Sequence, residues 1–360
     1  MRLHLPAIPH TQTREAFSHC AFTGKVLKFV PMMRAQGYEV VHYGVGDENP
    51  GATEHVSLMS VDEQSRLLGY VAGADHRAFV GNDANVGHPL YQHFNQRLRQ
   101  ELAGRATADD VVCLPFGHAH QAGVEGTPAR LLESGVGYPV CFTTFRVYES
   151  NAWYAFHAGK DGTGGHDYQW VIPNYFVVND WKLGTGPRRY LAYFGRIVPI
   201  KGVNVVAAIA KARPDLDVIL CGQGDPTPWL SKDIPNLTYR EPLTGTARSD
   251  FLGGAIALLA PSYYIEPFCG VTVEANLCGT PALTSDHGAF PETVENGNNG
   301  WRCHVLRDWL AGIRWTEQIT HHAAIRTEAV GKYGLDAIGP RYRAVLNQLA
   351  DLNGKGWYAD

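Results

Sequence analysis

Two glutamates, Glu266 and Glu274, stand eight positions apart in the stretch EPFCGVTVE. Glu266 precedes Pro267, which disfavours a helical conformation for the glutamate, while the proline itself suits the first turn of a helix. At helical rise the two carboxylates would lie roughly 12 Å apart and differ by about 80° in phase. That separation exceeds the roughly 5–9.5 Å between the paired carboxylates of glycosidases. The spacing instead suits one long ligand with hydroxyl groups at both ends.

The backbone amides between the two carboxylates add a site for negative charge. Those near Phe268, Cys269 and Gly270 are expected at the positive end of a helix dipole, which attracts anions. A nucleotide sugar has this order of groups, with the sugar at Glu266, the diphosphate at the amides and the ribose at Glu274. If either carboxylate stood alone, a dipole partner or a solvated helix residue would be the simpler interpretation.

Two cations occur in a second loop, GRIVPIKG at 195–202. Arg196 and Lys201 follow an apolar run that closes at Gly195, and a helical pattern begins after them. Cations at the end of a strand and ahead of a helix form a natural clamp for a diphosphate. A pair of solvated surface charges is the alternative, and the strand–loop–helix context favours phosphate binding.

Two further glycine-bearing loops are less specific. CGQGD contains Gly222 and Gly224, which fit a nucleotide contact or an unliganded tight turn equally well. SDHGAFPE places the amides of Gly288, Ala289 and Phe290 just before a predicted helix start, where they could reach an oxyanion or sugar hydroxyls. An ordinary strand–helix connection explains that loop as well.

The elements around these loops alternate between strands and helices. In the second half, strands are predicted at 189–196, 217–225, 255–262 and 281–286, with helices at 202–213, 248–255 and through Glu274. In the first half, strands are predicted at 1–8, 38–44, 109–116 and 138–144, with helices at 25–36, 88–104 and 127–134. This alternation predicts an α/β fold of two Rossmann-like, doubly wound parallel-sheet domains that face a central cleft. The polar segment 179–189 is the predicted linker.

Composition excludes several classes of protein. The 360 residues suffice for two domains, and the net charge of −4 argues against a protein that mainly binds nucleic-acid backbone. No apolar run approaches the ~18 residues of a spanning helix, and the N-terminus is too short and polar for a signal peptide. Seven scattered cysteines without CxxC spacing fit a reducing cytoplasm. We therefore expect a cytoplasmic protein, with peripheral attachment to a membrane surface left open.

Residues 172–300 resemble the donor-binding half of the group 1 glycosyltransferases, which are retaining enzymes of family 4 with the GT-B fold. In the first half, VLKFVPMMRAQGYEVV at 26–41 resembles the first helix and second strand of that family. The motifs that carry the resemblance are VIPN (171–174), GRIVPIKG (195–202), CGQGD (221–225), PSYYIEPFCGVTVEA (261–275), CGTPALTSDHGAFPE (278–292) and NGWRC (299–303).

The resemblance implies roles for individual residues. Arg196 and Lys201 would hold the diphosphate, Glu266 the donor sugar and Glu274 the ribose, while the amides of Gly288–Phe290 would contact the donor sugar. Arg196, Lys201 and Glu266 are the implied catalytic residues. The acceptor would attack on the face that the diphosphate leaves, without a protein nucleophile.

The resemblance also implies the division of labour between domains. We expect an acceptor-binding domain at 1–180, a donor-binding domain at 181–338 and a C-terminal helix at 339–360 that packs back towards the first domain. A nucleoside-diphosphate sugar would be the substrate, most simply a UDP-sugar, with neither a metal nor another cofactor.

The sequence departs from the family pattern mainly where acceptors bind. Cys269 replaces a usual glycine, and the first loop has Gly24 alone instead of paired glycines. After the strand expected at 138–144, where many members carry a histidine near the reacting sugar, this chain reads TTFRVYES. The candidates for acceptor or donor-sugar contacts are Gly24, His118, His120 and Arg146.

Several functions stay open at this point. The acceptor hydroxyl could belong to a lipid-linked sugar, a polysaccharide, a small metabolite or a hydroxylated nucleobase, so nucleic acid is not excluded as acceptor. Another GT-B enzyme, such as a nucleotide-sugar epimerase or a phosphorylase, is one alternative. A non-catalytic nucleotide-sugar sensor or subunit is another. The DLD at 215–217 imitates a metal motif but is expected to be a connector away from the cleft.

Overall fold

The computed structural model describes residues 1–18, 20–73, 86–165 and 168–352. The described residues of the first half form a seven-stranded parallel sheet in the order β3-β2-β1-β4-β5-β6-β7. Its strands are β1 (Arg2–Pro6), β2 (Glu39–Val45), β3 (Glu54–Met59), β4 (Val111–Cys113), β5 (Arg130–Val136), β6 (Phe145–Tyr148) and β7 (Gln169–Val171). The helices around it are η1 (Glu15–Phe17), α1 (Ala21–Ala35), α2 (Val61–Leu68), α3 (Pro89–Arg105), η3 (Gly117–His120), α4 (Gln121–Val124) and α5 (Asn151–Asp161).

The described residues of the second half form a six-stranded parallel sheet in the order β10-β9-β8-β11-β12-β13. Its strands are β8 (Tyr190–Phe194), β9 (Asp217–Cys221), β10 (Leu237–Arg240), β11 (Ala255–Ala260), β12 (Ala282–Ser285) and β13 (Gly300–Cys303). The helices are η4 (Val178–Asp180), η5 (Pro199–Lys201), α6 (Val203–Ala212), α7 (Gly245–Gly253), α8 (Gly270–Leu277), α9 (Phe290–Thr293), α10 (Leu306–Thr316), α11 (His322–Tyr333) and α12 (Leu335–Asp351).

Both sheets reverse their strand order once, at β1/β4 in the first and at β8/β11 in the second. The central strands read as apolar runs such as AIALLA of β11 because helices cover both faces of a parallel sheet. In such folds ligands bind beyond the carboxyl ends of the strands at the reversal. The loops after β8 and β11 are those that contain Arg196, Lys201 and Glu266, so the fold brings the predicted site residues to one edge.

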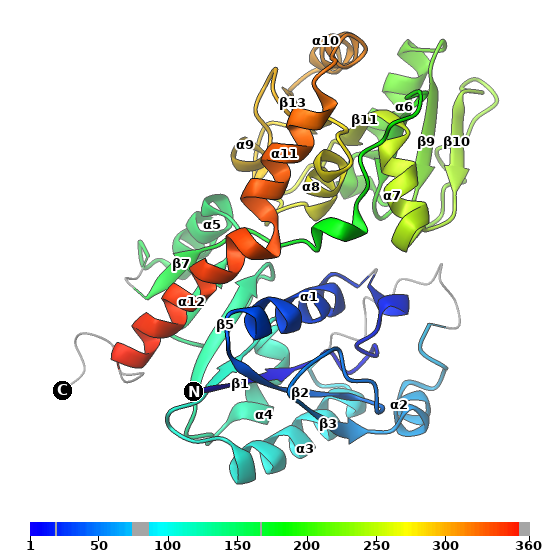
Figure 1. Ribbon diagram of the computed structural model, residues 1–360. Coiled ribbons are helices and arrows are strands. Elements are labelled where there is room, and N and C mark those ends of the chain that lie inside the picture. The colour runs from blue at the N-terminus through cyan, green and yellow to red at the C-terminus, as the bar shows by residue number, and fades with distance from the viewer. Residues whose placement is uncertain (19, 74–85, 166–167, 353–360) are drawn as a thin grey trace.

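The two-domain α/β prediction is confirmed, and Figure 1 shows the two sheets as separate lobes. Two elements were predicted wrongly. Residues 127–134 are not a helix, because RLLESGV forms β5, the strand between β4 and β6. Residues 138–144 form no strand, and the next strand after β5 is β6. A short apolar run fits helix and strand periodicity equally, and its place within the sheet decides which one forms.

The final helix, α12, crosses from the second lobe to the first (Figure 1). Its buried residues, among them Tyr342 and Leu346, belong to the same apolar cluster as Leu3 and Phe29 of the first sheet and α1. Helix α12 begins at Leu335, a few residues before the predicted 339. The predicted domain bounds at 1–180, 181–338 and 339–360 stay a prediction.

Candidate donor-binding site

Glu266 is the most strongly held side chain of the site, and it is only 3% exposed. Its Oε1 accepts a hydrogen bond from Lys201 Nζ at 2.6 Å and one from Ser262 Oγ at 2.5 Å. Its Oε2 accepts one from the Tyr264 hydroxyl at 2.6 Å. A buried carboxylate needs such compensation, because an unpaired charge away from water is costly. The structure thus brings Glu266 and Lys201, predicted from separate motifs, into direct contact.

Tyr264 links the two ends of this contact. Lys201 Nζ donates to the tyrosine oxygen at 2.8 Å and lies 4.8 Å from the ring centre. Burial and the nearby Glu266 carboxylate raise the pKa of the Tyr264 hydroxyl well above its ordinary value. The hydroxyl therefore stays protonated and donates to the carboxylate. Tyr264 was missed at the sequence level, although it stands two positions before Glu266.

Helix α8 begins at Gly270, later than expected, so Pro267 lies ahead of the helix and not in its first turn. The N-cap residue is Cys269, whose φ of 65° makes it the one positive-φ non-glycine among the described residues. Glycine would take this left-handed conformation at lower cost. Glu266 lies outside the helix and Glu274 within it, as the motif predicted.

Glycines allow the loops of the site to approach one another. A Cβ at Gly222 (φ 150°) would lie 1.8 Å from the Gly195 carbonyl oxygen, and one at Gly224 would lie 2.8 Å from that of Ile197. The loops after β8 and β9 therefore touch through backbone. A Cβ at Gly288 (φ 63°) would lie 2.6 Å from the Glu266 amide nitrogen.

The loop before α9 is fastened to the Glu266 loop. The Ala289 amide donates to the Glu266 carbonyl at 3.1 Å, and the Phe290 amide donates to the His287 carbonyl at 3.4 Å. Phe268 and Phe290 are buried, so they support the loops from within. Of the predicted sugar-contacting amides, that of Ala289 therefore joins the two loops.

Glu274 forms an ion pair with Arg248 of α7. The Arg248 guanidinium also lies 4.3 Å from the ring centre of Phe194, at the end of β8. This pair places a cation beside the carboxylate predicted to bind ribose. The sequence offered only the start of a short helix as a signal for Arg248, so its role was missed.

The first domain contributes a second buried ion pair, between Lys25 of α1 and Glu149. Lys25 Nζ also donates to the Gly135 carbonyl at 2.7 Å, and Asn174 Nδ2 donates to Glu149 Oε2 at 2.9 Å. Glu149 directly follows β6, so the end of this strand carries a buried carboxylate. Because a strand was predicted at 138–144, Glu149 was not recognised as a residue at the end of a strand.

Comparison with known proteins agrees with this geometry. Residues 179–318 match the family model described as glycosyl transferases group 1. The α-maltose-1-phosphate synthase of Mycolicibacterium smegmatis is 32% identical over 130 residues, which are 32% of this chain and 33% of that protein. The matching part thus spans about a third of that curated relative.

The C-terminal domain belongs to the group 1 glycosyltransferases. AviGT4, a glycosyltransferase involved in avilamycin A biosynthesis, has 18% identity and a TM-score of 0.66, with 98% of each chain covered. HepE of Anabaena, in complex with UDP and glucose, has 14% identity and a TM-score of 0.66, with 97% of this chain and 100% of that chain covered. These likenesses extend over both domains and establish the GT-B fold.

The candidate acceptor-side residues of the first domain differ in their exposure. Gly24 lies within the first turn of α1, where its amide donates to the Cys20 carbonyl at 2.9 Å. His118 is partly buried in η3, and burial lowers its pKa. His120 is fully buried, its Nδ1 lies 3.1 Å from Asn95 Oδ1, and burial lowers its pKa to about 3. His120 is thus packed into the domain interior, whereas His118 keeps some exposed surface.

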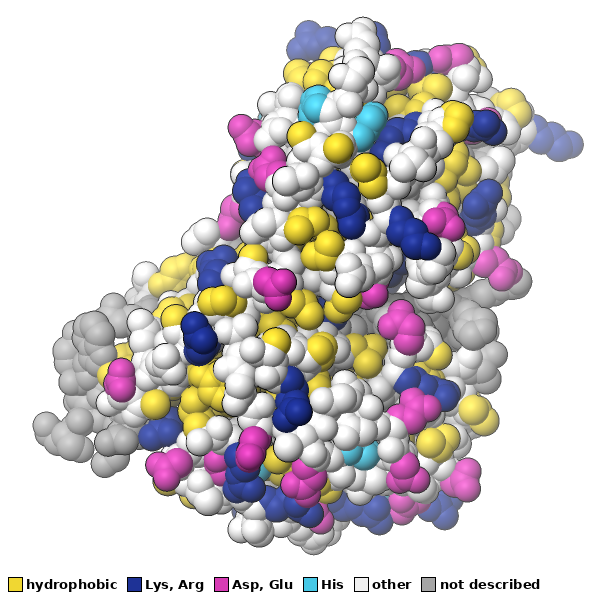
Figure 2. All heavy atoms as spheres, viewed as in Figure 1, with side chains coloured by type: hydrophobic (Ala, Val, Ile, Leu, Met, Phe, Trp, Pro, Cys, Tyr) yellow, Lys and Arg dark blue, Asp and Glu magenta, His cyan; other side chains and the backbone are white. Residues whose placement is uncertain are grey.

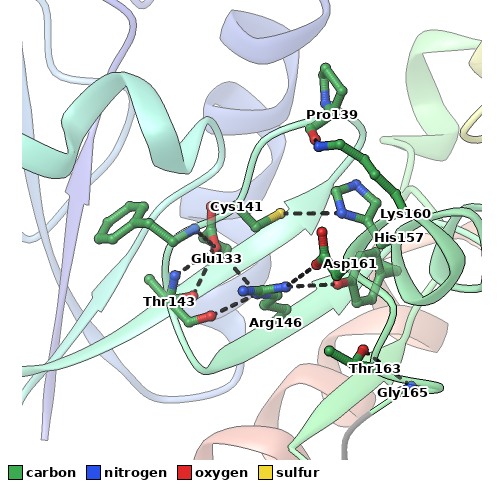
Figure 3. A network of polar contacts seen from close by, with 12 residues as sticks. Glu133, Pro139, Cys141, Thr143, Arg146, His157, Lys160, Asp161, Thr163 and Gly165 are labelled. Atoms are coloured by element: carbon green, nitrogen blue, oxygen red, sulfur yellow. Dashed lines mark hydrogen bonds and ion pairs between the residues drawn. The ribbon is translucent and has the colours of Figure 1, made fainter.

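Arg146 is tied into a network of the first domain, drawn in Figure 3. Its Nε donates to the Thr143 carbonyl at 2.7 Å and lies 3.7 Å from Glu133 Oε2, while Nη1 lies 3.5 Å from Asp161. Burial raises the pKa of Glu133, a shift that bonds from Thr143 and the charge of Arg146 oppose. In this structure Arg146 serves first to compensate buried Glu133.

A pocket of about 340 Å³ lies between the two domains. Glu149 and Asn151 of the first domain line it together with Phe268, Glu292 and Tyr333 of the second half. Phe268, just before the start of α8, belongs to the pocket lining, whereas Arg196 and Lys201 do not. Glu292 closes one side by accepting bonds from Asn151 and Ala152 at the start of α5.

The remaining surface carries mixed charge. In the face shown in Figure 2, acidic and basic side chains of the described residues are interspersed. Asp215 of the DLD stretch is exposed and pairs with Arg213 at 2.7 Å, which fits the predicted connector. Across the described ranges, His, Cys, Asp and Glu side chains form no cluster of three or more suited to a metal ion. None of the described helices is long and apolar enough to cross a membrane.

Proposed function

We propose that this protein is a retaining glycosyltransferase that moves a hexose-type sugar from a UDP-sugar to an acceptor hydroxyl. The observation that carries the proposal is the buried contact of Glu266 with Lys201 beside the start of α8. A carboxylate for sugar hydroxyls and a cation for phosphate lie there within one hydrogen bond of each other. The family match of the C-terminal domain and the likeness to HepE, crystallised with UDP and glucose, support the same substrate class.

In the proposed complex the donor lies along the carboxyl edge of the second sheet. Glu266 and the loop of Gly288–Phe290 bind the sugar, and Arg196 with Lys201 binds the diphosphate. The amides at the start of α8 add their dipole to the diphosphate site. Glu274 binds the ribose, and the adjoining Arg248 fixes the orientation of that carboxylate.

The proposed chemistry is departure of the nucleoside diphosphate with attack by the acceptor on the same face. Negative charge develops on the diphosphate oxygens, and fixed cations and amides stabilise it most where water is excluded. A phosphate oxygen takes the acceptor proton, so no protein nucleophile is needed. Because side chains and amides supply the positive charge, we propose that neither a metal nor another cofactor takes part.

The first domain is proposed to bind the acceptor from the opposite side of the cleft. The acceptor carries a hydroxyl group and belongs to one of four classes: a lipid-linked sugar, a polysaccharide end, a small metabolite or a hydroxylated nucleobase. A cytoplasmic location is part of the proposal, since nucleotide sugars are the substrates.

The test is release of nucleoside diphosphate from UDP-, GDP- and ADP-sugars, first without and then with candidate acceptors. Lys201→Ala should lower the rate by about 100-fold or more, as the loss of one preorganised electrostatic group does elsewhere. Glu266→Gln should act similarly. Lys211→Ala and Glu39→Gln change exposed charges away from the cleft, and both should retain the wild-type rate.

Release at the wild-type rate by Lys201→Ala would refute the mechanism. Binding of a donor without turnover on any acceptor would favour a non-catalytic sensor or subunit. Release that EDTA abolishes would contradict the metal-independent part alone. The anomeric configuration of the product, read by nuclear magnetic resonance, decides between retention and inversion.

A further inference from the structure

Lys28 of α1 is a cation of the first domain that has no role in the proposed mechanism. Helix α1 lies on the side of its domain that faces the second lobe (Figure 1). Lys28 is partly buried, yet its ammonium makes no hydrogen bond or ion pair with any described residue. It lies 4.6 Å from the ring centre of Phe176 and 5.8 Å from that of Tyr175.

Phe176 places this ammonium beside the start of α8. A Cβ at Gly270, the first residue of α8, would lie 3.6 Å from Cζ of the Phe176 ring. Phe176 also stacks on Phe268, the residue just before the N-cap. Lys28 therefore reaches, from the opposite domain, the helix end that the second domain presents to the diphosphate.

The charges around Lys28 leave its ammonium available for a ligand. The pKa of Lys28 is lowered to about 8, mainly by burial; the positive charges of Lys25 and Arg248 contribute to this shift, and the carboxylates of Glu274 and Glu149 oppose it. Asp180 of η4 also feels the positive charge of Lys28. Glu274 is already paired with Arg248, and Glu149 with Lys25. At neutral pH Lys28 is thus mostly protonated and poorly compensated by its neighbours.

We propose that Lys28 brings a positive charge from the first domain onto the diphosphate of the donor, opposite Arg196 and Lys201. The inference rests on the proposed function, because it assumes that a nucleoside diphosphate binds at the start of α8. It gives the first domain a direct part in donor binding. An anion between Lys28 and Lys201 would also draw the two domains together.

The test is calorimetric titration of the nucleoside diphosphate that the release assay identifies, beside the matching nucleoside without phosphates. Lys28→Met keeps the length of the side chain and removes its charge, and should weaken diphosphate binding about tenfold. Nucleoside affinity should change less than about twofold, because the nucleoside has no phosphate to pair with Lys28. Lys28→Arg should restore diphosphate binding to within about threefold. Lys211→Met, an exposed lysine of α6, is the matched control and should bind as the wild type does.

The pH dependence provides a second readout. Above the pKa of Lys28 the amine is neutral, so wild-type affinity for the diphosphate should fall between pH 7 and pH 9. Lys28→Arg stays charged and should lose this dependence. Nucleoside affinity should not change with pH in either protein.

Unchanged diphosphate affinity in Lys28→Met would overturn the inference and leave the proposed function standing. Equal losses of diphosphate and nucleoside affinity would also overturn it, because they would mark Lys28 as a packing residue of the domain junction. If the wild type bound no nucleoside diphosphate at all, the proposed function would fail and this inference with it. Thermal unfolding of each variant verifies that the fold is intact.

Discussion

At the scale of single residues, the site contains carboxylates that each pair with a buried or half-buried cation. Glu266 with Lys201, Glu274 with Arg248 and Glu149 with Lys25 each join two separate segments. A buried ion pair adds little to stability, but removing one partner leaves an uncompensated charge and costs much more. Such pairs therefore fix the positions of the side chains that a ligand would contact.

His120 provides a test of which predicted polar residues are structural. Its pKa of about 3 results first from burial and then from the neighbouring His118. The unfolded chain binds a proton at this position below about pH 6.5, whereas the folded protein does not. The free energy of unfolding should therefore fall as the pH drops from 6.5 towards 3, by about 1.4 kcal/mol per pH unit for this group.

His120→Gln should reduce that slope by the contribution of one histidine, as measured by denaturant unfolding at pH 7.5, 6.5 and 5. Transfer activity at pH 7.5 should change little for the fraction that is folded. An unaltered slope in His120→Gln would show that His120 is protonated in the folded protein.

At the scale of elements, helix ends connect the two domains. The carboxylate of Glu292 in α9 accepts bonds from the Asn151 amide (2.9 Å), the Asn151 side chain (2.8 Å) and the Ala152 amide (2.8 Å). It therefore caps α5 from the other domain. The same short helix follows the loop of Gly288, so this loop is connected to the first domain through Glu292.

Glu292→Ala should weaken this junction. The loss of a cap costs about 1 kcal/mol, and here it falls on the contact between domains. We expect a larger radius of gyration in small-angle scattering and a raised KM for the donor. Glu317→Ala removes an ion pair within the second domain, to Arg213, and should alter neither quantity. An unchanged radius of gyration and KM in Glu292→Ala would show that other contacts hold the two domains together.

At the scale of the whole molecule, the last helix makes the two lobes depend on each other. Tyr342 of α12 is fully buried, 5.3 Å from the Phe29 ring and 5.9 Å from the Tyr175 ring in edge-on contacts. Among the described residues, the chain leaves the first domain after β7 and contributes to its core again through this helix. The core of the first domain is therefore incomplete until the end of the chain has packed.

Tyr342→Ala should lower the free energy of unfolding by about 3–5 kcal/mol, as the loss of a large buried aromatic ring usually does. Asn347→Ala replaces an exposed residue of the same helix and should change stability by less than about 0.5 kcal/mol. Equal stability of the two variants in denaturant unfolding would show that α12 is dispensable for the first domain.

The second half could be predicted well because its signals are local. Runs such as DVILC of β9, bounded by a polar turn and a glycine, define a strand without help from distant residues. The first half was harder, and two of its elements were assigned wrongly. RLLESGV was taken for part of a helix, and the residues after it for a strand, because such a run fits either periodicity. That error moved the strand end away from Glu149.

The sequence by itself determined the alternation of strands and helices and the placement of Arg196, Lys201, Glu266 and Glu274 next to strand or helix ends. These features depend on residue types within a few positions of one another. Only the tertiary structure decided which charges meet: Lys201 with Glu266, Arg248 with Glu274 and Lys28 with the face of Phe176. The physical reason is that these contacts depend on the order of strands in the sheet and on how α1 packs opposite α8. Both are set by the burial of segments far apart in the chain.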